Sequence, residues 1–504
     1  MKLEALLHKV YGTTPNDGNL QPKEAVAYAV AGFGQNFICT IIGSYLTIFM
    51  TDALLFGSAN VMIGSVSGAM AVAYLMLGTR IFDACNDPIM GSIVDKTRTK
   101  YGKCRPYLKW MAIPIAIMTL LCFNPIVEAG TVRTFVYIAV VYVIWSVVYT
   151  VVDVPYWALS SSMTNNTIVR GNLLTVTRLV CTLGAGIVTV GVPIITDLVT
   201  AKYKDETGTV LPEFIYDNAN ALKWTYFICA VVFTVVAIPM FYYGFKNTKE
   251  RIKSLENPPS LGHNLKLLFK NRELMLIVIS GILGGARMVY TYTGGLYFAR
   301  YVLHNDSWYS LITLLVVPGG LVASLLVPWM TKKFTKKWAY IYVHILGAVV
   351  MFAMYFIGYD APWKLIVCAI GLVLLGIPQG ANNILSYAMI GDTVDYLEWK
   401  TGERAEGICF AMQTLMNKIG MAVGAFIGVF SYDWAGINPT AADGVYITAQ
   451  GEQTLWNLLV LSGALSMVGT IIPILFYRLT EKKQREMVKE IAERKAAQGE
   501  QEAE

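Results

Sequence analysis

The sequence predicts an all-α membrane protein in which twelve transmembrane helices form two six-helix halves, and three observations support this. Of its 504 residues, 55% are hydrophobic and only 15% are charged, and the mean hydropathy of +0.51 is too high for an ordinary soluble chain. Apolar runs of about 20 residues, long enough to cross the hydrocarbon core of a bilayer, recur along nearly the whole sequence. Lysine and arginine gather in alternate short loops between those runs.

Apolar runs bounded by charged or turn-rich segments set the limits of the expected spans. The first six lie near residues 25–52, 59–95, 106–126, 132–160, 170–197 and 222–245. The second six lie near residues 273–302, 308–331, 337–358, 363–391, 405–431 and 453–478.

The chain is therefore expected to have five regions. An N-terminal half (25–245) and a C-terminal half (273–478) are joined by a cytoplasmic connector (246–272). Residues 1–24 lack the apolar core and cleavage site of a secretory signal, so we expect a cytoplasmic N-terminal segment. Residues 479–504 form a cytoplasmic charged tail, expected to be a helix or a disordered extension.

Basic residues predict the orientation of the spans, because short cytoplasmic loops collect lysine and arginine. The loop after span two and the connector 246–272 are rich in both, whereas the segment 432–452 contains neither. Every loop from an even to an odd span, and both termini, are therefore expected in the cytoplasm. The basic loops after spans two and eight occupy equivalent places in the two halves, a weak internal repeat of the kind on which the major facilitator architecture is built.

Composition also argues against several other classes of protein. The net charge of +6 comes from basic residues in loops between apolar spans, so membrane topology explains it better than binding to nucleic acid. The eight cysteines are scattered and show no CxxC or metal-ligand spacing. No HExxH motif or Cys/His set indicates a membrane enzyme, and we expect no cofactor.

Span two carries a polar stripe. Arg80, Asp83, Asn86 and Asp87 fall on one helical face. An ionisable side chain near the bilayer centre costs about 2.5–3.5 kcal/mol, so such residues are functional candidates. Two carboxylates one turn apart repel each other, and a bound cation removes that repulsion. Pro88 also leaves the Ala84 carbonyl without its helical donor. The alternative is a charge network with Arg80 that only joins helices.

Span four carries a second stripe, formed by Ser146, Thr150, Asp153 and Trp157. A carboxylate that accepts hydrogen bonds from hydroxyl groups, beside an aromatic face, is typical of a sugar site. A lone tryptophan is more often a packing residue or an interface anchor, but this one shares a face with an intramembrane aspartate.

Polar side chains also occur in other spans of both halves, which predicts a central hydrophilic cavity. Span one offers Asn36, and span five offers Arg178, for which Asp153 is the expected counter-charge. Span seven contains Arg287, to which the sequence assigns no role. Spans ten and eleven offer Gln379, Asn382, Asn383, Ser386, Gln413, Thr414, Asn417 and Lys418.

Four strings give the chain a resemblance to the glycoside-pentoside-hexuronide cation symporter family. They are RIFDACNDPIMGSIVDKTRTKYGKCRPYL in span two and its loop, YTVVDVPYW in span four, GDTVDYLEW after span ten and QTLMNKIG in span eleven. The first is highly specific, and together with the spacing of the spans the strings cover most of the chain. Two departures stand out: Gln35 and Asn36 replace a Lys and an Asp of one family member, and Asn383 replaces its Trp.

The resemblance implies a role for each matching residue. It implies a cation site formed by Asp83, Asn86, Asp87 and Thr150, where an Asn at position 86 goes with sodium use in the family. It implies that Asp153, Trp157 and Arg178 face the sugar. Gln413, Thr414 and Lys418 match the family's motif on span eleven, where the Lys is expected close to both sites as a link between them. These three residues, Asn36 and Asn383 complete the candidate substrate site. Asp392 and Asp395 match a cytoplasmic motif and are assigned to gating, with a solvated helix end as the alternative.

The function expected from these residues is cation-coupled symport of a sugar or glycoside, not an enzymatic reaction. Sodium is the expected coupling ion, with protons or Li⁺ as alternatives, and the expected location is a bacterial plasma membrane, where the protein works as a monomer. Proton-coupled symport of a pentoside or hexuronide is the alternative within transporters. From another class, the alternative is a membrane solute sensor that does not transport. The departures in spans one and ten leave the particular sugar open.

Overall fold

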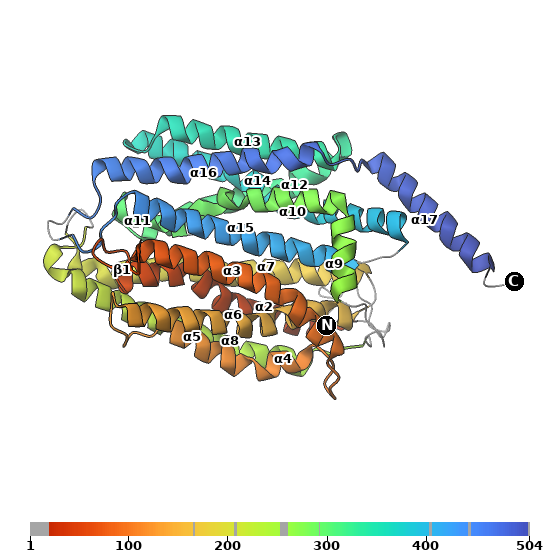
Figure 1. The fold of residues 1–504 in the computed structure, drawn as a ribbon, viewed down its shortest axis with the longest axis horizontal. Helices are drawn as coiled ribbons and strands as arrows, with labels where there is room; N and C mark the ends of the chain where they lie inside the picture. Colours follow the sequence, from red (N-terminus) through yellow and green to blue (C-terminus); the bar gives the residue numbers. More distant parts are fainter. Residues whose placement is uncertain are drawn as a thin grey trace, which may run out of the picture. The chain divides into compact units, whose positions relative to one another are not determined.

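The computed structural model describes residues 20–164, 167–205, 209–251, 261–291, 293–402, 406–441 and 445–501 (Figure 1). These residues are predominantly helical, and β1 (Met62–Ile63) and β2 (Val66–Ser67) form a short antiparallel hairpin. The chain divides into two compact units. Unit 1 comprises residues 1–258, 299–310 and 436–448, and unit 2 comprises 259–298, 311–435 and 449–504.

Unit 1 is built around helix α2. This helix packs on α7 and α8, while α3 packs on α6. Its helices are α2 (Pro22–Ile48), the π-helical turn η1 (Phe49–Ala53), α3 (Gly68–Lys96), α4 (Arg105–Trp110), α5 (Ala112–Cys122), α6 (Val132–Met163), α7 (Thr167–Thr200), the 3₁₀ turns η2 (Ala201–Tyr203) and η3 (Pro212–Phe214), and α8 (Ile215–Asn247).

Unit 2 is built around α13 and α16, which run side by side, with α14 against α13 (Figure 1). Its elements are α9 (Leu261–Lys270), α10 (Arg272–Leu283), the 3₁₀ turn η4 (Gly285–Thr291), most of α11 (Thr293–Tyr301) and of α12 (Ser307–Lys333), α13 (Lys336–Ile357), α14 (Pro362–Thr401), α15 (Glu406–Trp434), α16 (Ala449–Leu475) and α17 (Glu481–Gln501).

The helices follow most of the expected spans, but α3 begins at Gly68, nine residues after the expected start of span two, because the β1–β2 hairpin precedes it. Among the described residues, ten helices are long and apolar enough to cross a membrane. The expected third span holds two shorter helices, α4 and α5, because the chain turns at Met111. The expected seventh span is interrupted at η4, between α10 and α11. The count of twelve spans therefore stays a prediction, although helices occupy all twelve places.

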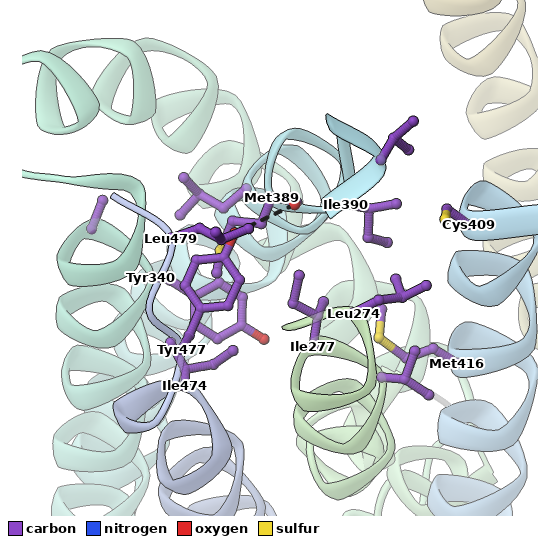
Figure 2. Close-up of a cluster of buried hydrophobic side chains, with 14 of the residues drawn as sticks. Leu274, Ile277, Tyr340, Met389, Ile390, Cys409, Met416, Ile474, Tyr477 and Leu479 are labelled. Atoms are coloured by element: carbon purple, nitrogen blue, oxygen red, sulfur yellow. Dashed lines mark hydrogen bonds between the residues drawn. The ribbon is translucent and has the colours of Figure 1, made fainter. Parts of the chain in front are cut away.

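A hydrophobic cluster joins helices of unit 2 (Figure 2). Tyr340 of α13, Met389 of α14 and Ile474 of α16 contribute to it, together with Tyr477 and Leu479 from the chain that follows α16. The hydroxyl of Tyr477 donates to the Met389 carbonyl oxygen at 3.5 Å. This cluster anchors the segment that leads into the C-terminal helix α17.

Close helix contact in unit 2 depends on glycine. A Cβ atom added at Gly376 of α14 would lie 2.8 Å from the Cα of Gly319 on α12 and would overlap the Val316 carbonyl oxygen. Small residues let helix backbones approach closely in a membrane. No heavy atom lies within 4 Å of a Cβ added at Gly391, farther along the same helix.

We predict that Gly376→Ala destabilises the protein, because the added methyl group forces α12 and α14 apart. Overpacking of this kind costs about 1–3 kcal/mol. The apparent Tm of the purified protein in detergent should fall by several degrees, whereas Gly391→Ala, the matched control on α14, should leave it unchanged. An equal Tm for the two variants would show that the α12–α14 contact does not require glycine.

Candidate functional site

The carboxylate of Asp83 is buried where α3 packs on α6. Its side chain is 2% exposed. The Asp83 Oδ1 atom accepts hydrogen bonds from Thr150 Oγ1 at 2.6 Å and from Ser146 Oγ at 3.1 Å. Ser146 and Thr150 are four residues apart on α6 and therefore present their hydroxyl groups on one face. Two of the residues assigned to a cation site, Asp83 and Thr150, are thus in direct contact.

The other two residues of the predicted cation site follow Asp83 on α3. Asn86 and Asp87 are half-buried and lie three and four residues along the helix, on the same face. Pro88 lies inside α3, which continues to Lys96. The arrangement gathers carboxylate, amide and hydroxyl oxygens, the ligand types that hard cations prefer.

A second buried carboxylate, that of Asp153 on α6, accepts hydrogen bonds from three donors. Asp153 Oδ1 accepts hydrogen bonds from Trp157 Nε1 at 3.1 Å, from the Tyr149 hydroxyl at 3.3 Å and from Gln35 Nε2 of α2. The Arg178 guanidinium of α7 lies 5.4 Å from the centroid of the Trp157 ring. Asp153, Trp157 and Arg178, which the sequence assigned to the substrate, therefore form one cluster with Gln35 and Tyr149.

Aromatic packing fixes the position of Tyr149. Its ring stacks on Trp145, with centroids 5.0 Å apart. The Trp145 indole in turn donates to Thr119 Oγ1 of α5 at 2.9 Å. This stack leaves the Tyr149 hydroxyl with little freedom, so its hydrogen bond to Asp153 is preorganised. The sequence analysis did not single out Tyr149, because it followed only the polar stripe formed by Ser146, Thr150, Asp153 and Trp157.

Gln35, rather than Asn36, reaches Asp153. Asn36 Nδ2 donates to the Gly32 carbonyl oxygen of its own helix at 2.9 Å. Adjacent helical residues point about 100° apart, so only one of them can face α6 directly. The role of Asn36 stays a prediction, and Gln35 joins the candidate site because it is 2% exposed and in contact with Asp153.

The remaining substrate candidates belong to unit 2. On α15, Gln413 is fully buried and Lys418 is 9% exposed, whereas Thr414 is exposed. On α14, Asn383 is exposed, whereas its neighbour Asn382 is fully buried and accepts a hydrogen bond from the Tyr340 hydroxyl at 3.0 Å. Asn382 therefore helps to hold α13 and α14 together within this unit.

The two gating candidates lie near the end of α14 and contact neighbouring elements. Both oxygens of Asp392 accept hydrogen bonds from Lys336 Nζ of α13 at 2.7 Å. Asp395 accepts one from Gln484 of α17 at 3.1 Å. Trp399 Nε1 of α14 donates to Glu490 of α17 at 2.6 Å. The C-terminal tail, to which the sequence gave only a helix or a disordered extension, is therefore helical over Glu481–Gln501 and bonded to α14.

Arg287, for which the sequence offered no role, lies at the interruption of the seventh span. It is 9% exposed, and its Nη1 atom donates to the Gly284 carbonyl oxygen at 2.7 Å. That carbonyl lies where α10 ends and η4 begins. The Arg287 side chain thereby adds a second hydrogen bond to a carbonyl oxygen that already accepts one from the Arg287 backbone N–H at 3.3 Å.

A family described as "MFS/sugar transport protein" matches residues 27–481. The chain belongs to this family. It is 28% identical over 413 residues to the "Isoprimeverose transporter" of Lactiplantibacillus pentosus, covering 81% of this chain and 80% of that protein. It is 26% identical over 480 residues to the "Glucuronide carrier protein homolog" of Escherichia coli, covering 94% and 96%.

Solved structures agree on the fold. The nucleoside transporter NupG superposes with a TM-score of 0.56 at 13% sequence identity, covering 90% of this chain and 99% of NupG. The predicted fold class is confirmed: the protein is an all-α, multi-pass membrane protein with the major facilitator fold. The prediction of a transporter rather than an enzyme is confirmed by the family.

The contacts of Gln35 generate a test of the substrate cluster. We predict that Gln35→Ala and Asp153→Asn each raise the KM for the transported solute about tenfold or more, with protein insertion unchanged. A tenfold change corresponds to about 1.4 kcal/mol, within the cost of losing a hydrogen bond to a charged group. Initial uptake rates measured over a range of solute concentrations give KM and the maximal rate separately.

Asn36→Ala is the matched control for Gln35→Ala, because Asn36 already bonds to its own helix. It should change KM less than Gln35→Ala does. A larger effect from Asn36→Ala would mean that Asn36, not Gln35, faces the solute.

Proposed function

We propose that the protein is a secondary active transporter that carries a sugar or glycoside across a bacterial plasma membrane together with a sodium ion. Alternating access moves the solute, and both termini lie in the cytoplasm. Membership of a sugar transport family supports the class of function. The observation that most supports cation coupling is the buried Asp83 carboxylate, which accepts hydrogen bonds from two hydroxyl groups of α6. Asn86 and Asp87 lie on the same face of α3.

The ligand types around Asp83 favour sodium over a proton. A proton needs only one carboxylate whose pKa burial has raised. Sodium needs several oxygen atoms at once, and these are supplied by Asp83, Asp87, Asn86 and the two hydroxyl groups of α6. A bound sodium ion would replace or share the hydrogen bonds that Thr150 and Ser146 now give to Asp83.

The second cluster suits a polyhydroxylated ring. The indole of Trp157 offers an aromatic face, and the Asp153 carboxylate can accept hydrogen bonds from sugar hydroxyls. Gln35 adds an amide, which is both donor and acceptor. Arg178 adds a cation that would also suit an acidic sugar, so neutral glycosides, pentosides and uronides all belong in a substrate screen. The names of the relatives, an isoprimeverose transporter and a glucuronide carrier homolog, span the same range.

The two clusters share α6, which offers a physical route for coupling. Thr150 and Asp153 are three residues apart, about one helical turn. Binding of a cation at Asp83 restrains this part of α6 and thereby orders Asp153 and Trp157 for the sugar. Linkage requires the converse, so the sugar must raise the affinity for the cation by the same factor.

We predict that uptake of the transported sugar into proteoliposomes is stimulated by an inward sodium gradient at fixed pH and membrane potential. Asn86→Ala should abolish most of this stimulation, because it removes a neutral oxygen ligand from the cation site. The measurement is initial uptake of each sugar in the screen, with and without the gradient, for wild type and variant. Cys85→Ala, next to Asn86 but exposed, is the matched control and should retain full stimulation.

Other outcomes would assign a different function. Uptake that ignores sodium but collapses when the proton gradient is dissipated would make Asp83 and Asp87 a protonation site. Specific sugar binding without accumulation under either gradient would indicate a sensor rather than a transporter.

A further inference from the structure

An ion-pair cluster that the sequence did not predict lies in unit 1, where α2 ends. Arg300 of α11 donates through Nε and Nη2 to the two oxygens of Asp306, at 3.0 and 2.6 Å. Its Nη1 atom donates to Asp52 of the π-helical turn η1. The Asp52 and Asp306 side chains are each 3% exposed and that of Arg300 is 13% exposed. One guanidinium thus joins two buried carboxylates.

Neighbouring contacts tie the same segment to the end of α7. Thr196 Oγ1 donates to Asp306 Oδ2 at 3.4 Å, and Ser307 Oγ donates to Asp197 Oδ2 at 3.2 Å. Asp197 is also paired with Lys204 at 2.7 Å. Ser310 Oγ donates to the Val190 carbonyl oxygen at 3.0 Å.

The segment that carries Arg300 and Asp306 comes from the second series of spans, although it packs in unit 1. Residues 299–310 connect the seventh and eighth expected spans and therefore come from the second series of six, yet they belong to compact unit 1. Residues 436–448, between the eleventh and twelfth spans, behave in the same way. For example, the Tyr446 hydroxyl donates to the Val210 carbonyl oxygen. Both segments are loops from an odd to an even span, which the distribution of Lys and Arg predicts to lie outside the cell.

Within the cluster, the ion pair between Arg300 and Asp52 joins residues from the two series of spans. The pair between Arg300 and Asp306 does not, because both residues lie in the same segment. Asp306 holds the guanidinium in place through a bidentate pair, a geometry that gives strength and direction. Burial alone would raise the pKa of the Asp306 carboxyl, but the charge and hydrogen bonds of Arg300 outweigh burial and lower it. Asp306 is therefore ionised, and it holds the Arg300 guanidinium where its Nη1 atom donates to Asp52.

We propose that Arg300, held by Asp306, forms an ionic latch with Asp52 that keeps the outer ends of the two series of spans together. The latch must break in each transport cycle before solute can enter from outside. A buried ion pair is costly to leave half-formed, so the contact favours the closed outer end. When the end opens, water can replace the lost partner of each charge. This inference rests on the proposed transport function, since it requires alternating access.

Thiol labelling tests the latch without any sugar or ion gradient. Ser310→Cys places a thiol at a residue that is 7% exposed, lies four residues after Asp306 and bonds to the Val190 carbonyl oxygen of α7. A membrane-impermeant maleimide, added outside right-side-out vesicles, reaches this thiol only when the outer end opens. The full chain with Ser310 unchanged serves as the blank for the eight native cysteines.

We predict that adding Asp52→Asn to Ser310→Cys speeds labelling about tenfold, the change that 1.4 kcal/mol produces. This substitution leaves Arg300 neutralised by Asp306, so folding should tolerate it. Arg300→Lys, which keeps the charge but lacks the planar fork that pairs with both oxygens of Asp306 while reaching Asp52, should also speed labelling. Lys364→Gln is the matched control: it breaks an exposed pair with Asp360, in a loop expected on the same side, and should leave the rate unchanged.

An unchanged rate in Asp52→Asn and Arg300→Lys proteins that insert normally would overturn the latch. The result also separates the latch from the proposed function. Faster labelling in a protein without sodium-coupled sugar uptake would keep the latch and reject the coupling, whereas coupled uptake with unchanged labelling would do the reverse.

Discussion

The hydrogen bonds that α6 gives to the Asp83 carboxylate are the interaction on which the functional account depends. An ionised carboxylate inside a membrane span is costly unless neighbouring groups solvate it. Two hydroxyl groups of α6 meet that requirement for Asp83. The same helix face supplies Asp153, whose donors come from α2 and from α6 itself. One helix therefore contributes hydrogen-bond donors to both Asp83 and Asp153, and its residues Thr150 and Asp153 lie about one turn apart.

The same constraint governs the charged groups elsewhere in the described chain. Arg300 lies between two carboxylates, Lys336 holds both oxygens of Asp392, and Arg287 bonds to a backbone carbonyl where the seventh span is interrupted. Buried charges are expensive to leave unpaired but can be exchanged between partners when water or an ion takes over. A transporter can use this property, because each paired charge marks a contact that is stable in one state and replaceable in another.

The sequence predicted well wherever one helix carried the information. The stripe on span four named Ser146, Thr150, Asp153 and Trp157, and all four take part in hydrogen bonds around Asp83 or Asp153, because helical spacing sets which residues share a face. The stripe did not reveal that Ser146 and Thr150 bond to Asp83 while Asp153 forms a separate cluster. Which neighbouring helix each residue meets is decided by packing.

The sequence did not predict contacts between residues that lie far apart in the chain. Choosing between Gln35 and Asn36 needs the rotation of α2 against α6, and a sequence pattern leaves that angle undetermined. Arg300 and Asp52 are 248 residues apart in the chain, with no periodicity linking them. The contacts of α17 with Asp395 and Trp399 likewise depend on the turn after α16, where Tyr477 and Leu479 enter the core.

Equilibrium sodium binding to the purified protein shows whether Asp83 and its hydroxyl donors bind the coupling cation. Titration calorimetry without sugar should show saturable sodium binding by wild type, weaker binding by Thr150→Val and none by Asp83→Asn. Sodium binding with wild-type affinity by a correctly folded Asp83→Asn protein would show that the cation binds elsewhere.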